Sequence, residues 1–269
     1  MKVPFLDLHA SYIELQNEID FSISRVLNSG RYIGGSEVES FEDEFSNYCG
    51  SKFTIGVANG LDALVLSLKS LDIGIGDEVI VPANTFIATW LAVSEVGAIP
   101  VPVEPNPFTY NIDVEEIQKA ITSKTKAIIP VHLFGQPADL DPILLLAKQH
   151  NLFIIEDAAQ AIGSRYKKKR IGAHGDLVCW SFYPGKNLGA FGDAGAISTN
   201  NEALANKIRS LSNYGSNKKY IHNFIGVNSR LDPIQAAILK VKLQFLDSWI
   251  DRRKNIASVY SSALNSHLD

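Results

Sequence analysis

The chain has 269 residues, of which 46% are hydrophobic and 20% are charged. This length and composition fit a globular protein with one large domain, or one domain and part of a second, that needs no disulfide or metal to stabilise its core. Because the net charge is −4, the sequence argues against a protein built mainly to bind nucleic acid.

Targeting signals and metal motifs are absent from the sequence. Its most apolar stretch, residues 85–103, is interrupted by Glu95 and Pro100, and the first residues are too polar for a signal peptide. Cys49 and Cys179 form no CxxC motif and indicate reduced thiols. With no HExxH, paired CxxC or EF-hand pattern, we expect a cytoplasmic protein without a dedicated metal site that binds neither membranes nor nucleic acid.

The predicted elements begin with amphipathic helices over residues 11–27 and 36–48. Short strands then alternate with helices. The strands are expected over residues 53–57, 78–81, 99–103, 127–131 and 152–155, and the helices over 61–71, 86–96, 114–121 and 142–150. The strands lack polar alternation, as strands covered on both faces do. This order predicts an α/β fold with a mostly parallel sheet.

The pattern changes after residue 157. Strands are expected over residues 177–182 and 194–199, and helices over 202–214, 234–246 and from Trp249 onward. The sequence ends shortly after this last helix begins. We therefore expect residues 1–245 to form a large domain with an N-terminal helical segment, and residues 246–269 to begin a smaller, incomplete C-terminal domain.

Ligands of open α/β sheets bind where strands end and helices begin. In VANGLDAL, residues 57–64, Asn59 and Gly60 could leave free backbone N–H groups at a helix N-terminus, where they would bind a phosphate. The alternative is an ordinary Asn-Gly turn with a helix cap. In IIEDAAQA, residues 154–161, Asp157 could hold a protonated ring nitrogen, or could be a solvated helix cap.

Two further junctions carry a lysine and an aromatic residue. In SFYPGKNLGAFGDAGA, Lys186 lies in Gly- and Pro-rich backbone, which suits a Schiff-base lysine but also a surface loop. In VPANTFIATW, Phe86 begins a helix and could stack on a flat ligand or pack in the core. His132, after a predicted strand, is interpreted as a hydrogen-bonded structural residue in preference to a catalytic one.

The order of these junctions resembles that of pyridoxal-phosphate enzymes with the aspartate-aminotransferase fold. More narrowly, the chain resembles the DegT/DnrJ/EryC1/StrS sugar aminotransferases from PFLDL at Pro4 to RLDPIQAA at residues 230–237. The resemblance implies a large domain of PLP fold type I and pyridoxal 5′-phosphate as the cofactor.

The resemblance also implies roles for individual residues. Lys186 matches the lysine that forms the Schiff base and moves the proton, and Asp157 matches the acid that keeps the pyridine nitrogen protonated. The other cofactor-binding positions are Asn59, Gly60 and Leu61 in the phosphate loop, Phe86 stacking on the ring, Gln160 beside the phenolic oxygen, Ser181 as the hydroxyl partner of the phosphate loop, and Asn228. Asn228 matches an asparagine that the other subunit of a dimer lends to the phosphate, so we expect a homodimer.

The substrate follows from the same resemblance. The family implies transamination of a nucleotide-linked keto-sugar with L-glutamate as amino donor, in the biosynthesis of deoxyamino sugars for lipopolysaccharide or other glycans. VANGLDAL, PVHLFGQPADLDPI and SFYPGKNLGA most resemble the branch that aminates dTDP-3-keto-6-deoxyhexoses. A dTDP- or UDP-4-keto-sugar 4-aminotransferase is the near alternative, and an inactive, truncated cofactor-binding fragment is another. A nucleotide-binding dehydrogenase is disfavoured, because the sequence has no glycine-rich dinucleotide fingerprint.

Overall fold

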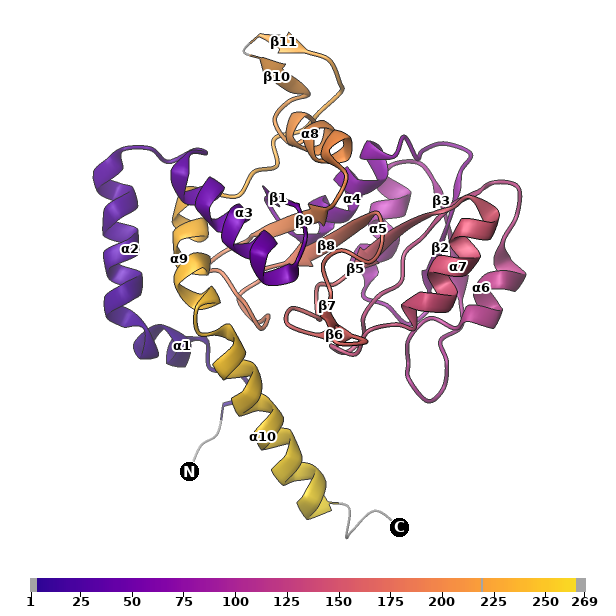
Figure 1. Cartoon of the computed structure of the whole chain (residues 1–269). Coiled ribbons are helices and arrows are strands. Elements are labelled where there is room, and N and C mark those ends of the chain that lie inside the picture. Colours follow the sequence, from indigo (N-terminus) through magenta and orange to yellow (C-terminus); the bar gives the residue numbers. More distant parts are fainter. Residues whose placement is uncertain (1–3, 219, 265–269) are drawn as a thin grey trace.

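A seven-stranded sheet forms the centre of the computed structural model, which describes residues 4–218 and 220–264 (Figure 1). In spatial order its strands are β1 (Phe53–Val57), β9 (Gly195–Thr199), β8 (Leu177–Ser181), β5 (Phe153–Asp157), β4 (Thr125–Ile128), β2 (Glu78–Pro82) and β3 (Ile99–Val103). All neighbours are parallel except that β9 runs antiparallel to both β1 and β8. The predicted α/β fold with a mostly parallel sheet is confirmed.

Helices cover both faces of this sheet (Figure 1). One face carries α4 (Gly60–Ser70), α5 (Ile87–Glu95) and α8 (Glu202–Leu211), and the other carries α3 (Ser36–Cys49), α6 (Val114–Ala120), α7 (Leu140–His150) and α9 (Pro233–Leu243). Neighbouring residues of β8 serve opposite faces: Cys179 packs with α4 and α8, and Trp180 packs with α3 and α9. Because both faces are buried, the strands need no polar alternation.

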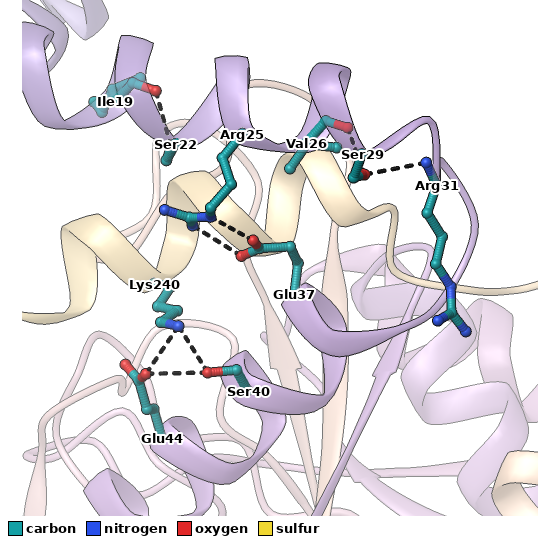
Figure 2. Close-up of polar contacts among 10 residues, drawn as sticks. All are labelled: Ile19, Ser22, Arg25, Val26, Ser29, Arg31, Glu37, Ser40, Glu44 and Lys240. Atoms are coloured by element: carbon teal, nitrogen blue, oxygen red, sulfur yellow. Dashed lines mark hydrogen bonds and ion pairs between the residues drawn. The ribbon is translucent and has the colours of Figure 1, made fainter.

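Helix α9 lies between α3 and α2 (Gln16–Ser29), and polar contacts tie the three helices together (Figure 2). Arg25 of α2 pairs with Glu37 of α3, with Nε and Oε1 2.6 Å apart. Lys240 of α9 lies with its Nζ 2.7 Å from the Ser40 Oγ and 3.3 Å from the Glu44 Oε1, both on α3. Pairs near the surface add little stability singly, and it is the packing of α9 against both α2 and α3 that places it between them.

The first predicted helix is wrong in one respect: residues 11–27 are divided between α1 (Leu8–Glu14) and α2 at Leu15. Leu15 is buried against Ile238 and Trp249, so packing fixes the break. The strand expected over residues 127–131 is β4, which ends at Ile128. Pro130 has no amide N–H to extend the ladder.

Short hairpins and the last helix complete the described chain. The hairpins are β6 (Arg165–Tyr166) with β7 (Lys169–Arg170), and β10 (Ser216–Lys218) with β11 (Ile221–His222). Helix α10 (Leu246–Leu264) buries Leu246 and Trp249 and then extends away from the sheet, with residues 251–264 exposed (Figure 1). The predicted domain boundary at 245 stays a prediction, and residues 1–3 and 265–269 of the two expected domains lie outside the described ranges. Among the described helices, none has the length and apolar character needed to cross a membrane.

Candidate active site

A cleft of about 720 Å³ opens at the carboxyl ends of β1, β5 and β8. Parallel strands end at one edge of a sheet, so residues far apart in the sequence meet there. The predicted site residues that line the cleft are Asn59, Gly60, Leu61, Phe86, Asp157, Gln160, Ser181 and Lys186. Asn228 does not line it. The structure therefore brings together the four junctions singled out in the sequence.

The N-terminus of α4 forms one wall of the cleft. The Asn59 side chain caps this helix, its Oδ1 accepting the amide of Asp62 at 2.8 Å. The amides of Gly60 and Leu61 precede any intrahelical partner and, with the helix dipole, favour an anion. A Cβ on Gly60 would stand 2.7 Å from the Cβ of Ser181, so glycine lets α4 begin this close to the end of β8. The groups that could bind an anion here are main-chain amides, and the Asn59 side chain caps the helix.

Asp157 ends β5 and is only 7% exposed. Its Oδ2 accepts a hydrogen bond from the Thr89 hydroxyl at 2.9 Å, and its Oδ1 accepts the Ala159 amide at 3.1 Å. Burial raises the pKa of Asp157 above its ordinary value, although these hydrogen bonds and the charge of Lys186 oppose the rise. A buried carboxylate of this kind gains from a cationic partner in the cleft.

Thr89 is a site residue that sequence reasoning missed. It is fully buried on α5, and its Oγ1 lies 2.9 Å from the Oγ1 of Thr85, which lines the cleft. The two threonines flank Phe86 at a spacing of four residues, which places their side chains on one side of a helix start. This spacing is the signal that could have found Thr89. Tyr183 and Asp193 also line the cleft and were not predicted.

We expect Thr89→Val to weaken cofactor binding about tenfold, because it removes a hydrogen bond to a charged group worth roughly 1.5 kcal/mol. Valine has nearly the same shape, so packing on α5 is retained. The measurement is the dissociation constant of pyridoxamine 5′-phosphate, with Thr109→Val as a control on an exposed loop. An unchanged constant in Thr89→Val would show that the hydroxyl does not serve Asp157.

Lys186 lies in the loop that follows β8, its main-chain amide bonded to the carbonyl of Tyr183 at 2.8 Å. Its side chain is half-buried and lines the cleft. Burial lowers the pKa of the Lys186 amine, and the Asp157 carboxylate opposes this shift. A lowered pKa increases the share of neutral amine, which is the nucleophilic form.

Phe86 precedes α5 and is 73% exposed, so it is not the core residue that the alternative interpretation expected. It presents its ring at the cleft, where Gln160 is also exposed. Asn228 is exposed outside the cleft, where its backbone pairs with that of Asn213. The predicted contact of Asn228 with the cofactor phosphate of a neighbouring subunit stays a prediction.

His132 is fully buried, as expected for a structural residue, and does not line the cleft. Its Nδ1 accepts the Ala138 amide at 3.1 Å, which leaves the proton on Nε2, 2.9 Å from the Oε2 of Glu156. Glu156 also accepts the amide of Gly175 at 2.6 Å. The His132–Glu156 hydrogen bond thus holds the residue just before Asp157 in place.

The cleft fits pyridoxal 5′-phosphate. The amides of Gly60 and Leu61 suit a phosphate, buried Asp157 suits a cationic ring nitrogen, Phe86 offers an aromatic face and Lys186 offers an amine. Within residues 4–218 and 220–264, no group of three or more potential metal-ligating side chains occurs.

Comparisons with known proteins agree with this geometry. A profile of the DegT/DnrJ/EryC1/StrS aminotransferase family matches residues 14–268. The chain is 55% identical over 263 residues to the dTDP-3-amino-3,4,6-trideoxy-alpha-D-glucose transaminase of Streptomyces venezuelae, covering 98% of this chain and 69% of that protein. It is 57% identical over 258 residues to the dTDP-3-amino-3,6-dideoxy-alpha-D-galactopyranose transaminase of Aneurinibacillus thermoaerophilus, covering 96% and 71%.

The fold of this chain is also similar to the folds of solved structures. The S. venezuelae DesV structure in complex with a ketimine intermediate has a TM-score of 0.96 at 55% identity, covering 98% of this chain and 71% of that one. The structure of ntda from Bacillus subtilis with bound cofactor PMP has a TM-score of 0.91 at 37% identity, covering 98% and 61%.

Proposed function

Because the chain belongs to the DegT/DnrJ/EryC1/StrS family of pyridoxal 5′-phosphate-dependent aminotransferases, we propose that it aminates a nucleotide-linked keto-6-deoxysugar with L-glutamate as donor. The substrate proposed first is a dTDP-3-keto-6-deoxyhexose, which becomes the 3-amino sugar. The names of relatives at 55% and 57% identity support this choice, since both are dTDP-3-amino sugar transaminases. Glutamate gives up its amino group and, taking an oxygen atom from one water molecule, leaves as 2-oxoglutarate. The keto oxygen of the sugar leaves as one water molecule, so no water is consumed overall.

The observation that carries the proposal is the meeting of Lys186 and buried Asp157 in one cleft. Bound there, pyridoxal 5′-phosphate supplies an electron sink that stabilises negative charge on the substrate carbon. The amides of Gly60 and Leu61 would hold its phosphate, and the Asp157 carboxylate would keep its ring nitrogen charged. Lys186 would hold the cofactor covalently through its amine and, as a free amine, would move the proton between the substrate carbon and the C4′ carbon of the cofactor.

The remaining proposals concern the oligomeric state, the cellular location and the roles of further residues. We propose a cytoplasmic homodimer in which Asn228 reaches the cofactor phosphate of the neighbouring subunit, and its exposure outside its own cleft supports this arrangement. Gln160 is proposed to lie beside the phenolic oxygen, Ser181 beside the phosphate and Phe86 on the ring. A domain boundary near residue 245 is supported by the exposure of residues 251–264 in α10.

A half-reaction on the 269-residue chain tests the function. The protein is loaded with pyridoxal 5′-phosphate, L-glutamate is added, and the visible absorption band of the cofactor is followed. A dTDP-3-keto-6-deoxyhexose or its 4-keto isomer is then added, and the sugar product is identified by mass spectrometry. We expect the band to disappear with glutamate and return with the 3-keto sugar.

The other outcomes separate the alternatives. Return of the band with the 4-keto sugar alone would favour the 4-aminotransferase. A band that forms but never responds to glutamate would indicate an inactive cofactor-binding fragment, and failure to form a band would refute the cofactor role of Lys186 in this chain.

A further inference from the structure

Helix α9 contacts the loop that carries Lys186, although no residue of α9 lines the cleft. The loop joins β8 to β9, and two side chains of α9 bind its main chain. The Gln235 Oε1 accepts the amide of Phe191 at 2.8 Å. The Lys242 Nζ donates a hydrogen bond to the carbonyl of Gly189. The helix therefore holds the loop at two points close after Lys186.

The lysine of this contact is unusually buried. Lys242 is 3% exposed, and its Nζ lies 4.9 Å from the centre of the Phe191 ring. Burial, together with the charge of Arg253, lowers the pKa of Lys242 to about 8. Burial of an ammonium group costs free energy unless specific contacts compensate for the lost water. Among the described residues, no carboxylate forms an ion pair with Lys242. The contacts it makes are to the loop: the Gly189 carbonyl and the Phe191 ring.

The loop folds back tightly, so holding Gly189 also holds the segment around Lys186. A Cβ added at Gly189 would collide with the carbonyl of Pro184, two residues before Lys186. The amide of Ala190 is bonded to the carbonyl of Phe182 at 2.8 Å, which closes the base of the loop. Displacement of Gly189 would therefore shift Pro184 and the turn that presents Lys186.

The helix itself is a firm support. Gln235 and Lys242 are seven residues apart and so share one face of α9. Lys240 points to a different neighbour, α3, where it contacts Ser40 and Glu44 (Figure 2). With α2 packed on its outer side, α9 is fixed independently of the loop.

We propose that Gln235 and Lys242 are positioning residues that set the place of the Lys186 amine by holding the main chain at Phe191 and Gly189. The inference rests on the proposed role of Lys186. Reaction rates depend steeply on the position of a nucleophile, and a shift of about 1 Å can cost roughly 100-fold. These two contacts therefore affect covalent capture of the cofactor aldehyde more than binding of its phosphate and ring.

The test separates capture from binding. Cofactor-free wild type, Gln235→Leu and Lys242→Met are mixed with pyridoxal 5′-phosphate, and the growth of the visible band gives the capture rate. Borohydride reduction followed by peptide mass spectrometry locates the label on Lys186. The dissociation constant of pyridoxamine 5′-phosphate, which has no aldehyde and cannot bond to Lys186, reports binding alone.

We expect capture to slow about tenfold or more in both variants, with an unchanged dissociation constant for pyridoxamine 5′-phosphate. Lys240→Met, on the same helix but facing α3, is the matched control and is expected to capture at the wild-type rate. Gln235→Glu keeps an acceptor oxygen for the Phe191 amide and is expected to restore the rate lost in Gln235→Leu.

Capture at the wild-type rate in Gln235→Leu would overturn the proposal, as would parallel losses of capture and of pyridoxamine 5′-phosphate affinity. If thermal unfolding shows that Lys242→Met does not fold, the capture rates of Gln235→Leu and Gln235→Glu alone decide whether the proposal holds. Failure of the wild type itself to capture the aldehyde on Lys186 would instead refute the proposed function, so the two failures are distinguishable.

Discussion

Replacing Lys186 with alanine is expected to abolish glutamate-dependent transamination, lowering the single-turnover rate by at least about 1,000-fold, within the range that general acid–base catalysis supplies. Among the described residues no other lysine lines the cleft, so the variant would lose both the covalent attachment and the group proposed to move the proton. The measurement is the rate at which L-glutamate converts bound cofactor, followed by the product 2-oxoglutarate.

The control for Lys186→Ala is binding of pyridoxamine 5′-phosphate, which is expected to persist because the amides of Gly60 and Leu61 remain in place. Added methylamine is expected to restore part of the rate, since a small amine can enter the space that the side chain leaves. Transamination at the wild-type rate in Lys186→Ala would contradict the role assigned to this residue.

Replacing Asp157 with asparagine is expected to lower kcat by about 100- to 1,000-fold, comparable to removing one preorganised electrostatic contact from an active site. Asparagine has almost the same size and can still accept the hydrogen bond from Thr89, but it carries no charge to hold a cationic ring nitrogen. The measurement is kcat for the overall reaction. Asp43→Asn, an exposed acid of α3 outside the cleft, is the control.

The pH dependence of binding provides a second measurement on Asp157. Because burial raises the pKa of Asp157, the carboxyl of the cofactor-free protein takes up a proton at a higher pH than an exposed aspartate does. A cationic ring nitrogen needs the ionised form, so affinity for pyridoxamine 5′-phosphate falls as the pH falls through this raised pKa. Asp157→Asn has no such proton to release and is expected to lose this part of the pH dependence. An identical pH profile in both proteins would show that Asp157 does not face the ring nitrogen.

The sheet could be predicted closely from the sequence, because its strands are short β-branched runs between clear turn signals. β1 and β3 have the predicted bounds, residues 53–57 and 99–103. The break at Leu15 could not be predicted, since the apolar spacing of residues 11–27 is continuous. Burial of Leu15 against Ile238 and Trp249 decides it, and these residues lie more than 200 positions along the chain.

The cleft could be predicted in the same way, because strand ends of a parallel sheet meet at one edge. What the sequence does not reveal is which residues of different motifs contact each other. Thr89 and Asp157 are 68 positions apart, and Phe191 and Gln235 are 44 positions apart. No single motif holds both members of either pair, so each contact becomes visible only when α5 and α9 are placed on the sheet.

The pairing of β1 with β9 has a consequence for the order of folding. The hydroxyls of Thr54 and Ser198, 3.0 Å apart in the sheet, are separated by 144 positions. Contacts this distant in sequence carry a large loop-closure cost and form slowly. A ribosome-bound chain that has not yet released β9 leaves β1 without a neighbour in the sheet. The helix N-terminus that follows β1 therefore acquires its final position only after synthesis has passed Thr199, the last residue of β9, and a nascent chain becomes competent to bind its cofactor only after that point.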